Sequence, residues 1–180
     1  MPFIEFLQTN NVNSFIEIGT YRGGTMYVLS SICGGKKISV DFVNAANGYK
    51  ENDKEVDLGD INVVKRNQSL SDIFTDIHFV CGDSHRFETH KKVADILKGD
   101  KVDLIFIDGD HSYYGVKRDS EMYSEFVRFG GFIAFHDIKR CEKHNELNCH
   151  VDEFWNELQG EKTEFCISDT KDMGIGVIKI

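Results

Sequence analysis

The run Val102-Asp103-Leu104-Ile105-Phe106-Ile107 decides the fold, because five of its six residues are apolar. A strand with one face in water alternates apolar and polar residues, whereas a nearly continuous apolar run is typical of a central strand buried on both faces. Similar short apolar segments recur along the chain, and amphipathic segments separate them. The expected strands are 14–19, 38–42, 78–83, 102–107, 131–135, 163–167 and 174–180, and the expected helices are 25–33, 69–76, 87–97, 114–129 and 151–158.

This alternation of strands and helices predicts an α/β fold with a doubly wound, mostly parallel, seven-stranded sheet. The last two strands are separated only by residues 168–173, which is too short for the crossover that a parallel pair needs. We therefore expect an antiparallel last strand. The stretch 43–65 is polar and poorly periodic, so we expect a loop there, with at most one short helical piece.

Composition limits the partners of the chain. Its 180 residues, 41% of them hydrophobic, suit one core, so we expect a single domain over 1–180. With 21 Lys+Arg against 30 Asp+Glu, the net charge of −9 disfavours nucleic acid and anionic membrane surfaces. No apolar run approaches the ~20 residues of a transmembrane helix, and the N-terminus does not resemble a signal peptide. Five cysteines without a CxxC pattern indicate reduced thiols, and together these features predict a cytoplasmic location.

The first expected strand ends in the glycine-bearing turn Gly19-Thr20-Tyr21-Arg22-Gly23-Gly24. A dinucleotide fingerprint needs glycines at the first, third and sixth positions, and here the third is Tyr21. No Gly-Lys-Ser/Thr follows, so a P-loop is excluded as well. The turn argues against a nicotinamide-dependent oxidoreductase and leaves two readings: a ligand with an adenosine and a charged tail but no phosphate, or a turn that binds nothing.

Two further strand ends carry carboxylates. Asp41 lies 22 residues after Gly19, where an acidic side chain can accept both hydroxyls of a ribose. Asp83, followed by Ser84, can accept from the amino group of an adenine. Each alone could be an ordinary solvated acid, but at one edge of a sheet the three strand ends predict an adenosine slot.

Residues 15–25, Phe-Ile-Glu-Ile-Gly-Thr-Tyr-Arg-Gly-Gly-Thr, resemble the first motif of class I S-adenosylmethionine-dependent methyltransferases. Segments 103–119 and 130–138 resemble more specifically the macrocin- and cephalosporin-hydroxylase-like O-methyltransferases, and 154–158 and 174–178 also fit. The resemblance extends from about Asn13 to the end of the chain. It implies a Rossmann-like methyltransferase fold, S-adenosyl-L-methionine as cofactor, and methyl transfer to a sugar or phenolic hydroxyl of a small molecule.

The resemblance also implies roles for single residues. A carboxylate at Glu17 suits the ammonium group of the cofactor, and the missing Cβ of Gly19 allows close approach of the methionine moiety. Asp41 would hold the ribose hydroxyls. The further cofactor contacts that we expect are Asp83 and Ser84 at the adenine, together with Tyr21, Gly23 and Asp108.

Asp108 and Asp137 follow adjacent apolar strands, and two neighbouring carboxylates repel each other unless a cation or proton lies between them. The resemblance implies a divalent metal such as Mg or Mn there, which would lower the pKa of the acceptor hydroxyl. The third ligand position holds His136, and imidazole suits Mn, Fe or Zn better than Mg. Asp110 and His111 are alternative ligands, and His111 is also a candidate catalytic base. For both histidines a purely structural role stays open.

Two alternatives remain. Residues 141–150 contain two Cys and two His, but their spacing matches no usual zinc pattern, so a substrate-side loop is favoured over a zinc site. Only about a dozen residues precede the first strand, so the N-terminal helices that often cover the acceptor in this family are not expected. This brevity makes a non-catalytic cofactor-binding module the second functional hypothesis. The expected partner is a small-molecule acceptor, and homo-oligomerisation stays open.

Overall fold

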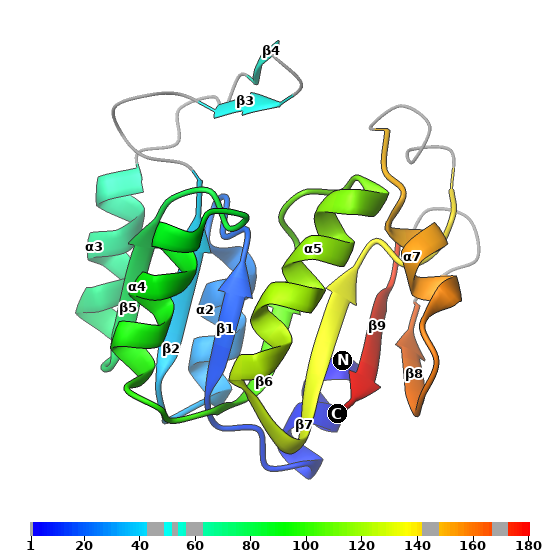
Figure 1. Ribbon diagram of the computed structural model, residues 1–180. Coiled ribbons are helices and arrows are strands. Elements are labelled where there is room, and N and C mark those ends of the chain that lie inside the picture. The colour runs from blue at the N-terminus through cyan, green and yellow to red at the C-terminus, as the bar shows by residue number, and fades with distance from the viewer. Residues whose placement is uncertain (1, 43–48, 52–53, 57–62, 142–147, 167–172) are drawn as a thin grey trace.

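A computed structural model describes residues 2–42, 49–51, 54–56, 63–141, 148–166 and 173–180. Its main sheet has the strand order β5-β2-β1-β6-β7-β9-β8 (Figure 1). The strands are β1 Phe15–Ile18, β2 Lys37–Asp41, β5 Ile77–Cys81, β6 Val102–Ile107, β7 Val127–His136, β8 Lys162–Phe165 and β9 Ile175–Lys179. The predicted seven-stranded sheet is confirmed.

Strand directions in the sheet follow the prediction. Five strands are parallel to one another: β5, β2, β1, β6 and β7. By contrast, β9 is antiparallel to both of its neighbours, β7 and β8. The chain proceeds outward from β1 in one direction through β2 and β5, and then in the other through β6 and β7. Ligands of such sheets bind at the carboxyl ends of the strands near this reversal, which here lies between β1 and β6.

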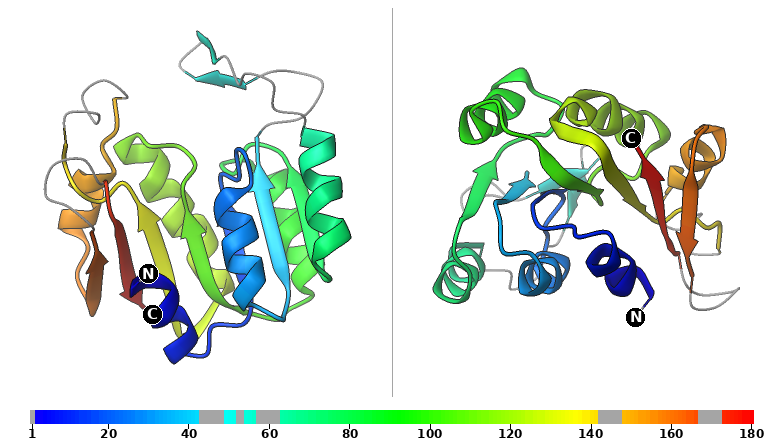
Figure 2. Two further views of the ribbon diagram at one scale, coloured as in Figure 1. Left: turned by 180° about the vertical axis from the view of Figure 1, so that it is seen from behind. Right: turned by 90° about the horizontal axis from the view of Figure 1, so that it is seen from below.

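Helices cover both faces of the sheet, as the view from below in Figure 2 shows. Leu104 and Phe106 of β6 belong to the core shared with α1, α2 and α3, whereas Ile105 and Ile107 belong to the core shared with α4, α5 and α7. The bounds are α1 Pro2–Thr9, α2 Gly24–Ile32, α3 Val63–Ile73, α4 Phe87–Leu97, α5 Tyr113–Tyr123 and α7 Val151–Glu157. Each of these side chains, fully buried, contributes about 1.5–3 kcal/mol, which explains why β6 is apolar on both faces.

No helix in the described ranges could cross a membrane. The longest of them, α3, α4 and α5, have eleven residues each, about half of what a hydrocarbon core requires.

Two expected helices differ clearly in their bounds. The helix expected at 69–76 is α3, which begins at Val63 and ends at Ile73; the polar residues 65–69 separate its first two valines from Leu70, so periodicity did not reveal its start. The helix expected at 114–129 ends at Tyr123, and a short 3-10 helix, η1 (Ser124–Phe126), leads directly into β7. The apolar pair Phe126 and Val127 continues the helical period, which hid the change from helix to strand.

Two elements were not expected. Within the predicted loop 43–65, β3 (Tyr49–Glu51) and β4 (Lys54–Val56) pair as an antiparallel hairpin; residues 43–48, 52–53 and 57–62 lie outside the described residues. Before the first strand, α1 packs Phe3 and Phe6 against Phe165 of β8, with ring centroids 5.5 and 5.4 Å apart. This helix therefore extends the core under the antiparallel end of the sheet.

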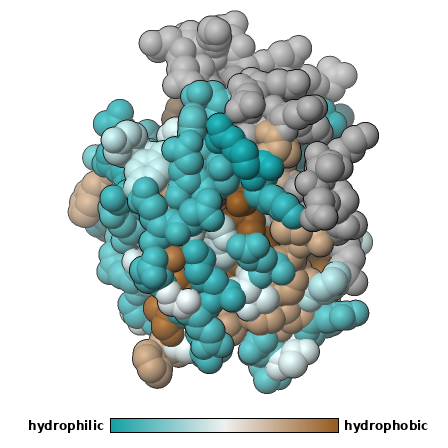
Figure 3. All heavy atoms as spheres, turned by 90° about the vertical axis from the view of Figure 1, so that its right-hand side faces the viewer, coloured by the Kyte–Doolittle hydropathy of each residue, from teal (hydrophilic) through white to brown (hydrophobic). Residues whose placement is uncertain are grey.

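The sheet ends at β8 on the side of the molecule that Figure 3 shows. The described residues of this side are mostly hydrophilic, with smaller apolar patches between them. β8 itself has the sequence Lys-Thr-Glu-Phe, and charged side chains on an edge strand discourage pairing with another sheet.

Candidate active site

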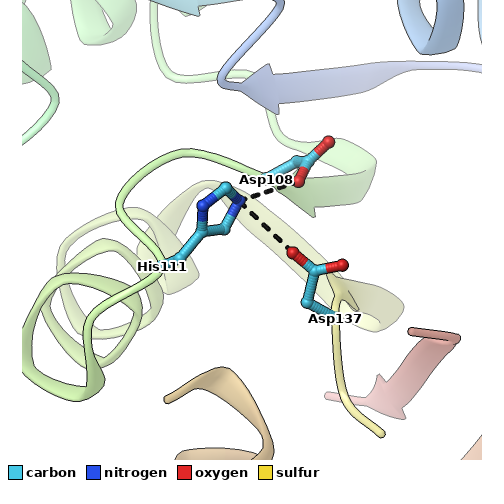
Figure 4. A group of neighbouring side chains, drawn as sticks. All are labelled: Asp108, His111 and Asp137. Carbon is cyan, nitrogen blue, oxygen red and sulfur yellow. Dashed lines mark hydrogen bonds and ion pairs between the residues drawn. The ribbon is translucent and has the colours of Figure 1, made fainter. Parts of the chain in front are cut away.

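The carboxyl ends of β6 and β7 bring two acids and a histidine together. Ile107 pairs with Phe135, so Asp108 and Asp137 leave the sheet beside each other. His111, on the loop after β6, lies between them: its Nε2 is 3.3 Å from Asp108 Oδ1 and 3.4 Å from Asp137 Oδ2 (Figure 4). One ligand atom from each of the three lies within 4.8 Å of the others. The geometry of a small cation site is therefore present, formed by residues from two strand ends.

A second imidazole, that of His136, lies against the same pair of acids. Its Nδ1 is 2.6 Å from Asp137 Oδ1 and 3.5 Å from Asp108 Oδ1. The predicted ligand set of Asp108, Asp137 and His136 is thus close in space, and His111, expected as a base or an alternative ligand, completes a four-membered cluster. Two carboxylates with imidazoles form a donor set that fits Mn, Fe or Zn better than Mg.

Backbone geometry at Asp137 is unusual for a residue with a side chain. Its φ is +63°, in the left-handed region that aspartate tolerates but seldom adopts. The Asp137 N–H donates to the carbonyl of Gly174, 3.0 Å away, so the end of β7 is held to the chain just before β9. The tertiary fold therefore imposes this conformation, which directs the carboxylate towards Asp108.

Glu17, the predicted partner of the cofactor ammonium, lies in β1 and is fully buried. The nearby hydroxyl of Thr20 is paired with that of Ser39 at 2.6 Å, and neither oxygen of Glu17 has a hydrogen-bond partner among the described residues. The pKa of Glu17 is raised to about 8: burial is the largest cause, the Thr20 hydroxyl opposes it, the negative charges of Asp108 and Asp41 add to the rise, and the charge of Arg66 lowers it. A buried carboxyl group in this state fits a ligand that brings a cation to it.

Gly19 makes the closest contact between the ends of β1 and β6. Its φ is +85°, and a Cβ there would overlap the backbone carbonyl of Asp108. Only glycine therefore fits, which brings the first turn directly against the loop that carries the acidic cluster. The predicted contact of Gly19 with a ligand stays a prediction.

Asp41, the predicted ribose acceptor, is not a solvated strand-end acid. Its Oδ2 lies 2.7 Å from Nη1 of Arg66, and the two side chains are only 9% and 7% exposed. The same guanidinium group donates to the carbonyl of Tyr21, so Arg66 joins the ends of β1 and β2. Sequence reasoning missed Arg66, because it follows a stretch predicted as a loop and lies in the polar residues 65–69 of α3. A ribose reaching Asp41 would have to share it with this cation.

The remaining predicted cofactor residues lie around the same edge. Asp83 closes its own loop after β5: its Oδ1 accepts from the His85 N–H at 2.9 Å, and its Oδ2 lies 3.4 Å from Nε of Arg86. The Ser84 carbonyl accepts from the Tyr123 hydroxyl at 3.2 Å. Gly23 precedes α2 with φ +81°, and Tyr21 is half exposed. The adenine role of the loop after β5 stays a prediction.

The expected substrate-side loop at 141–150 is described only at its ends, since 142–147 lie outside the described residues. At the described end, burial raises the pKa of the Cys149 thiol to about 12, which keeps it protonated. The His150 ring pairs with Glu153 at 2.9 Å, and the backbone N–H of His150 donates to the His111 carbonyl at 2.8 Å. This hydrogen bond ties the described end of the loop to the backbone of the acidic cluster.

Comparison with known proteins agrees with this arrangement. The model of a family described as "Methyltransferase domain" matches residues 16–138, the span from β1 to just beyond Asp137. The fold, with β9 inserted antiparallel between β7 and β8, is that of class I S-adenosylmethionine-dependent methyltransferases. The chain belongs to the methyltransferase-domain family.

Individual relatives are more distant. An uncharacterised protein, R132, of Acanthamoeba polyphaga mimivirus is 32% identical over 134 residues; the match covers 70% of this chain, which spans about half (52%) of that protein. An O-methyltransferase from Bacillus cereus, solved with S-adenosylhomocysteine, has a TM-score of 0.66 at 16% identity, covering 98% of this chain and 78% of that one. The N-methyltransferase NodS from Bradyrhizobium japonicum, also solved with S-adenosylhomocysteine, has a TM-score of 0.61 at 13% identity, covering 99% and 84%. Since one of these two proteins is an O-methyltransferase and the other an N-methyltransferase, the fold does not decide which acceptor atom is methylated.

Proposed function

We propose that this chain transfers a methyl group from S-adenosylmethionine to a hydroxyl group of a small molecule, with a divalent cation held by Asp108, Asp137 and His111 or His136. The observation that carries the proposal is the cluster itself, in which ligand atoms of Asp108, His111 and Asp137 lie within 4.8 Å of one another. An ionised hydroxyl is a nucleophile that such a cation stabilises, whereas an amine acceptor needs only to lose a proton.

The roles of the residues follow from their positions. Glu17 would bind the cofactor ammonium, since its buried carboxyl group has no hydrogen-bond partner within the described ranges of the chain, and Asp41 would accept from the ribose. Bound there, the cofactor supplies an electrophilic methyl group. Asp108 and Asp137 would hold the cation, and the histidine that is not a ligand would accept the hydroxyl proton on its imidazole ring. Most of the acceleration would come from orientation of the two reactants and from charge already in place.

The first test measures binding. Thermal unfolding is followed with S-adenosylmethionine and S-adenosylhomocysteine, each alone and with Mg, Mn or Zn. We expect both adenosyl ligands to raise the melting temperature, and Mn or Zn to raise it more than Mg. NAD should have no effect. If neither adenosyl ligand stabilises the protein, the proposed cofactor is wrong.

The second test measures transfer. S-adenosylhomocysteine release is followed with a panel of sugar and phenolic hydroxyl acceptors, with each metal and with a chelator. We expect release that depends on both acceptor and metal, and Asp137→Asn should abolish the metal dependence. Asp95→Asn, which alters an exposed acid that pairs with Lys91 on α4, is the matched control. Cofactor binding without release for any acceptor would favour the non-catalytic module, and release unaffected by chelation would contradict the metal role.

A further inference from the structure

A buried ion pair, formed by His85 and Asp119, lies behind the candidate active site. Asp119 is on α5 and is 0% exposed, and neither of its oxygens has a well-formed hydrogen bond within the part of the chain that the structure describes. The His85 ring faces this carboxylate, with Nε2 at 3.3 Å from Asp119 Oδ1. A buried carboxylate is costly unless it is paired, so His85 is the group that compensates this charge.

The surroundings of His85 favour its protonated form. Nε2 faces two acceptors, Asp119 Oδ1 and the Gly115 carbonyl at 3.2 Å, so it must carry a hydrogen. Nδ1 faces a third acceptor, Asp83 Oδ1, at 4.0 Å. The bond to Asp119 raises the pKa of His85, outweighing the opposing effect of burial, and Asp83 and Asp110 raise it further.

Two arginines and one neutral donor also lie near the pair. Arg118 of α5 donates from Nη2 to the His85 carbonyl at 3.0 Å, so its charge is directed at the backbone. Arg86 is exposed and pairs with Asp83. Tyr123 of α5 donates to the Ser84 carbonyl, and burial raises the pKa of its hydroxyl, which stays neutral. None of them replaces the His85 charge beside Asp119.

The pair joins two loops that flank the candidate active site. His85 belongs to the loop after β5, next to Asp83 and Ser84. Asp119 lies behind Gly109, which follows Asp108: a Cβ built at Gly109 would be 3.4 Å from Asp119 Oδ2 and 3.2 Å from Ile18 at the end of β1. Asp119 thus contacts the loop of the acidic cluster from behind, while His85 connects it to the loop predicted to hold the adenine.

We propose that His85 and Asp119 are a positioning pair, which fixes the adenine-side loop 83–86 against the loop 109–110 and so preforms the cofactor site. The site it positions is that of the proposed function; the pair touches neither the reacting atoms nor the cluster. Loss of the His85 proton leaves Asp119 with a neutral partner and loosens the connection. Cofactor affinity then carries a pH dependence that originates outside the groups contacting the cofactor.

The test compares the parent with His85→Gln, which keeps a neutral N–H donor for Asp119 but cannot ionise. S-adenosylhomocysteine affinity is measured by calorimetry from about pH 6 to about pH 9. The two proteins share all of their other titratable groups, so the ratio of the two affinities isolates His85. We expect the parent to bind about five- to tenfold tighter than the variant at low pH, with the advantage lost as the pH rises, because the variant lacks the charge that pairs with the buried Asp119 carboxylate. A ratio that does not change with pH would overturn the proposal.

Two controls separate positioning from general stability. His90→Gln alters another half-buried histidine, on α4, which contacts Glu125 at 3.1 Å and the Met122 carbonyl at 3.0 Å rather than Asp119; the ratio of the parental affinity to that of this variant should not change with pH. Amide hydrogen exchange of 83–86 and 109–110 in the cofactor-free protein, corrected for the intrinsic pH effect, should rise with pH in the parent and stay constant in His85→Gln. Equal exchange in both would also overturn the proposal. If the parent binds no S-adenosylhomocysteine, the proposed function fails, and the exchange comparison still decides the role of the pair.

Discussion

Asp103 and Asp108 stand at opposite ends of the same strand, and their surroundings differ completely. Asp103, near the start of β6, accepts from the N–H groups of Asn13 and Ser14 at 3.0 and 2.9 Å, from the Ser14 hydroxyl at 2.9 Å, and from Arg128 Nε at 2.6 Å. Burial alone would raise its pKa, but these hydrogen bonds outweigh burial and lower the pKa of Asp103. All four of these donors belong to the folded chain itself, so this carboxylate stabilises the fold.

Asp108, just past the other end of β6, is surrounded by groups that compete with it. Its neighbours are a second carboxylate, Asp137, and the imidazoles of His111 and His136 at 3.3 and 3.5 Å. Asp108 also raises the pKa of buried Glu17. Acids that stabilise a fold are surrounded by fixed donors, whereas acids that await a ligand are surrounded by one another. The residue type is identical, so only its neighbours separate the two roles.

The largest effect is expected from Asp108→Ala. Loss of a cation ligand should lower the rate of methyl transfer by about a thousand-fold, because such a cation supplies several kcal/mol of charge stabilisation. The affinity for S-adenosylhomocysteine, measured by calorimetry, should change far less, and thermal stability should not fall. Transfer at the parental rate would show that Asp108 is no more functional than Asp103.

Asp103→Ala should show the reverse behaviour. Four donors lose their acceptor, one of them charged, so the free energy of unfolding in urea should fall by about 3 kcal/mol. The folded variant should transfer methyl groups at nearly the parental rate, because Asp103 lies at the other end of the sheet. An unchanged urea midpoint would contradict the structural role assigned to this acid.

Glu17 should make stability depend on pH. Its pKa is about 8 in the folded chain and close to 4.5 when unfolded, so the folded state holds the extra proton between these values. The contribution of this proton to the stability of the cofactor-free protein is therefore fully present at low pH and is lost as the pH rises towards 8. The free energy of unfolding should fall on the order of 2 kcal/mol between about pH 5.5 and about pH 7.5. Urea denaturation at each pH measures it. Glu17→Gln should remove this slope; a slope that survives the substitution would assign it to other groups.

The smallest effect is expected from Arg128→Ala. Arg128 is the partly exposed cation at Asp103, and the backbone donors of Asn13 and Ser14 remain when it is removed. The free energy of unfolding should fall by about 1 kcal/mol, since a half-exposed ion pair contributes little. A loss as large as that of Asp103→Ala would mean that Arg128, rather than the backbone donors, satisfies this carboxylate.

The elements that the sequence predicted well are those in which one physical requirement governs a whole segment. The apolar run at 102–107 had to be a strand covered on both faces, and the short link at 168–173 could only allow an antiparallel neighbour. The elements it predicted poorly depend on distant contacts. The polar residues 65–69 of α3 have no period of their own, yet they include Arg66, whose position is fixed by Asp41 and Tyr21 at two strand ends.

The same division holds at the candidate site. Strand ends alone placed Asp108 and Asp137 side by side, since the carboxyl ends of adjacent parallel strands share one edge. The choice between His111 and His136 could not be made from spacing, because a loop residue reaches the cluster only through the course of the loop. The His85–Asp119 pair left no pattern in the sequence, as its members are 34 residues apart on different elements.

The sequence by itself determined the class of fold, the edge at which the chemistry lies and most of the acids that line it, because periodicity and strand ends are local properties. Tertiary structure decided which carboxylates are satisfied and which are not, that Asp41 is bound by Arg66, and that two histidines rather than one face the Asp108–Asp137 pair. These outcomes depend on distances between segments remote in sequence, and the pKa and partners of a charged group are set by such distances rather than by its neighbours along the chain.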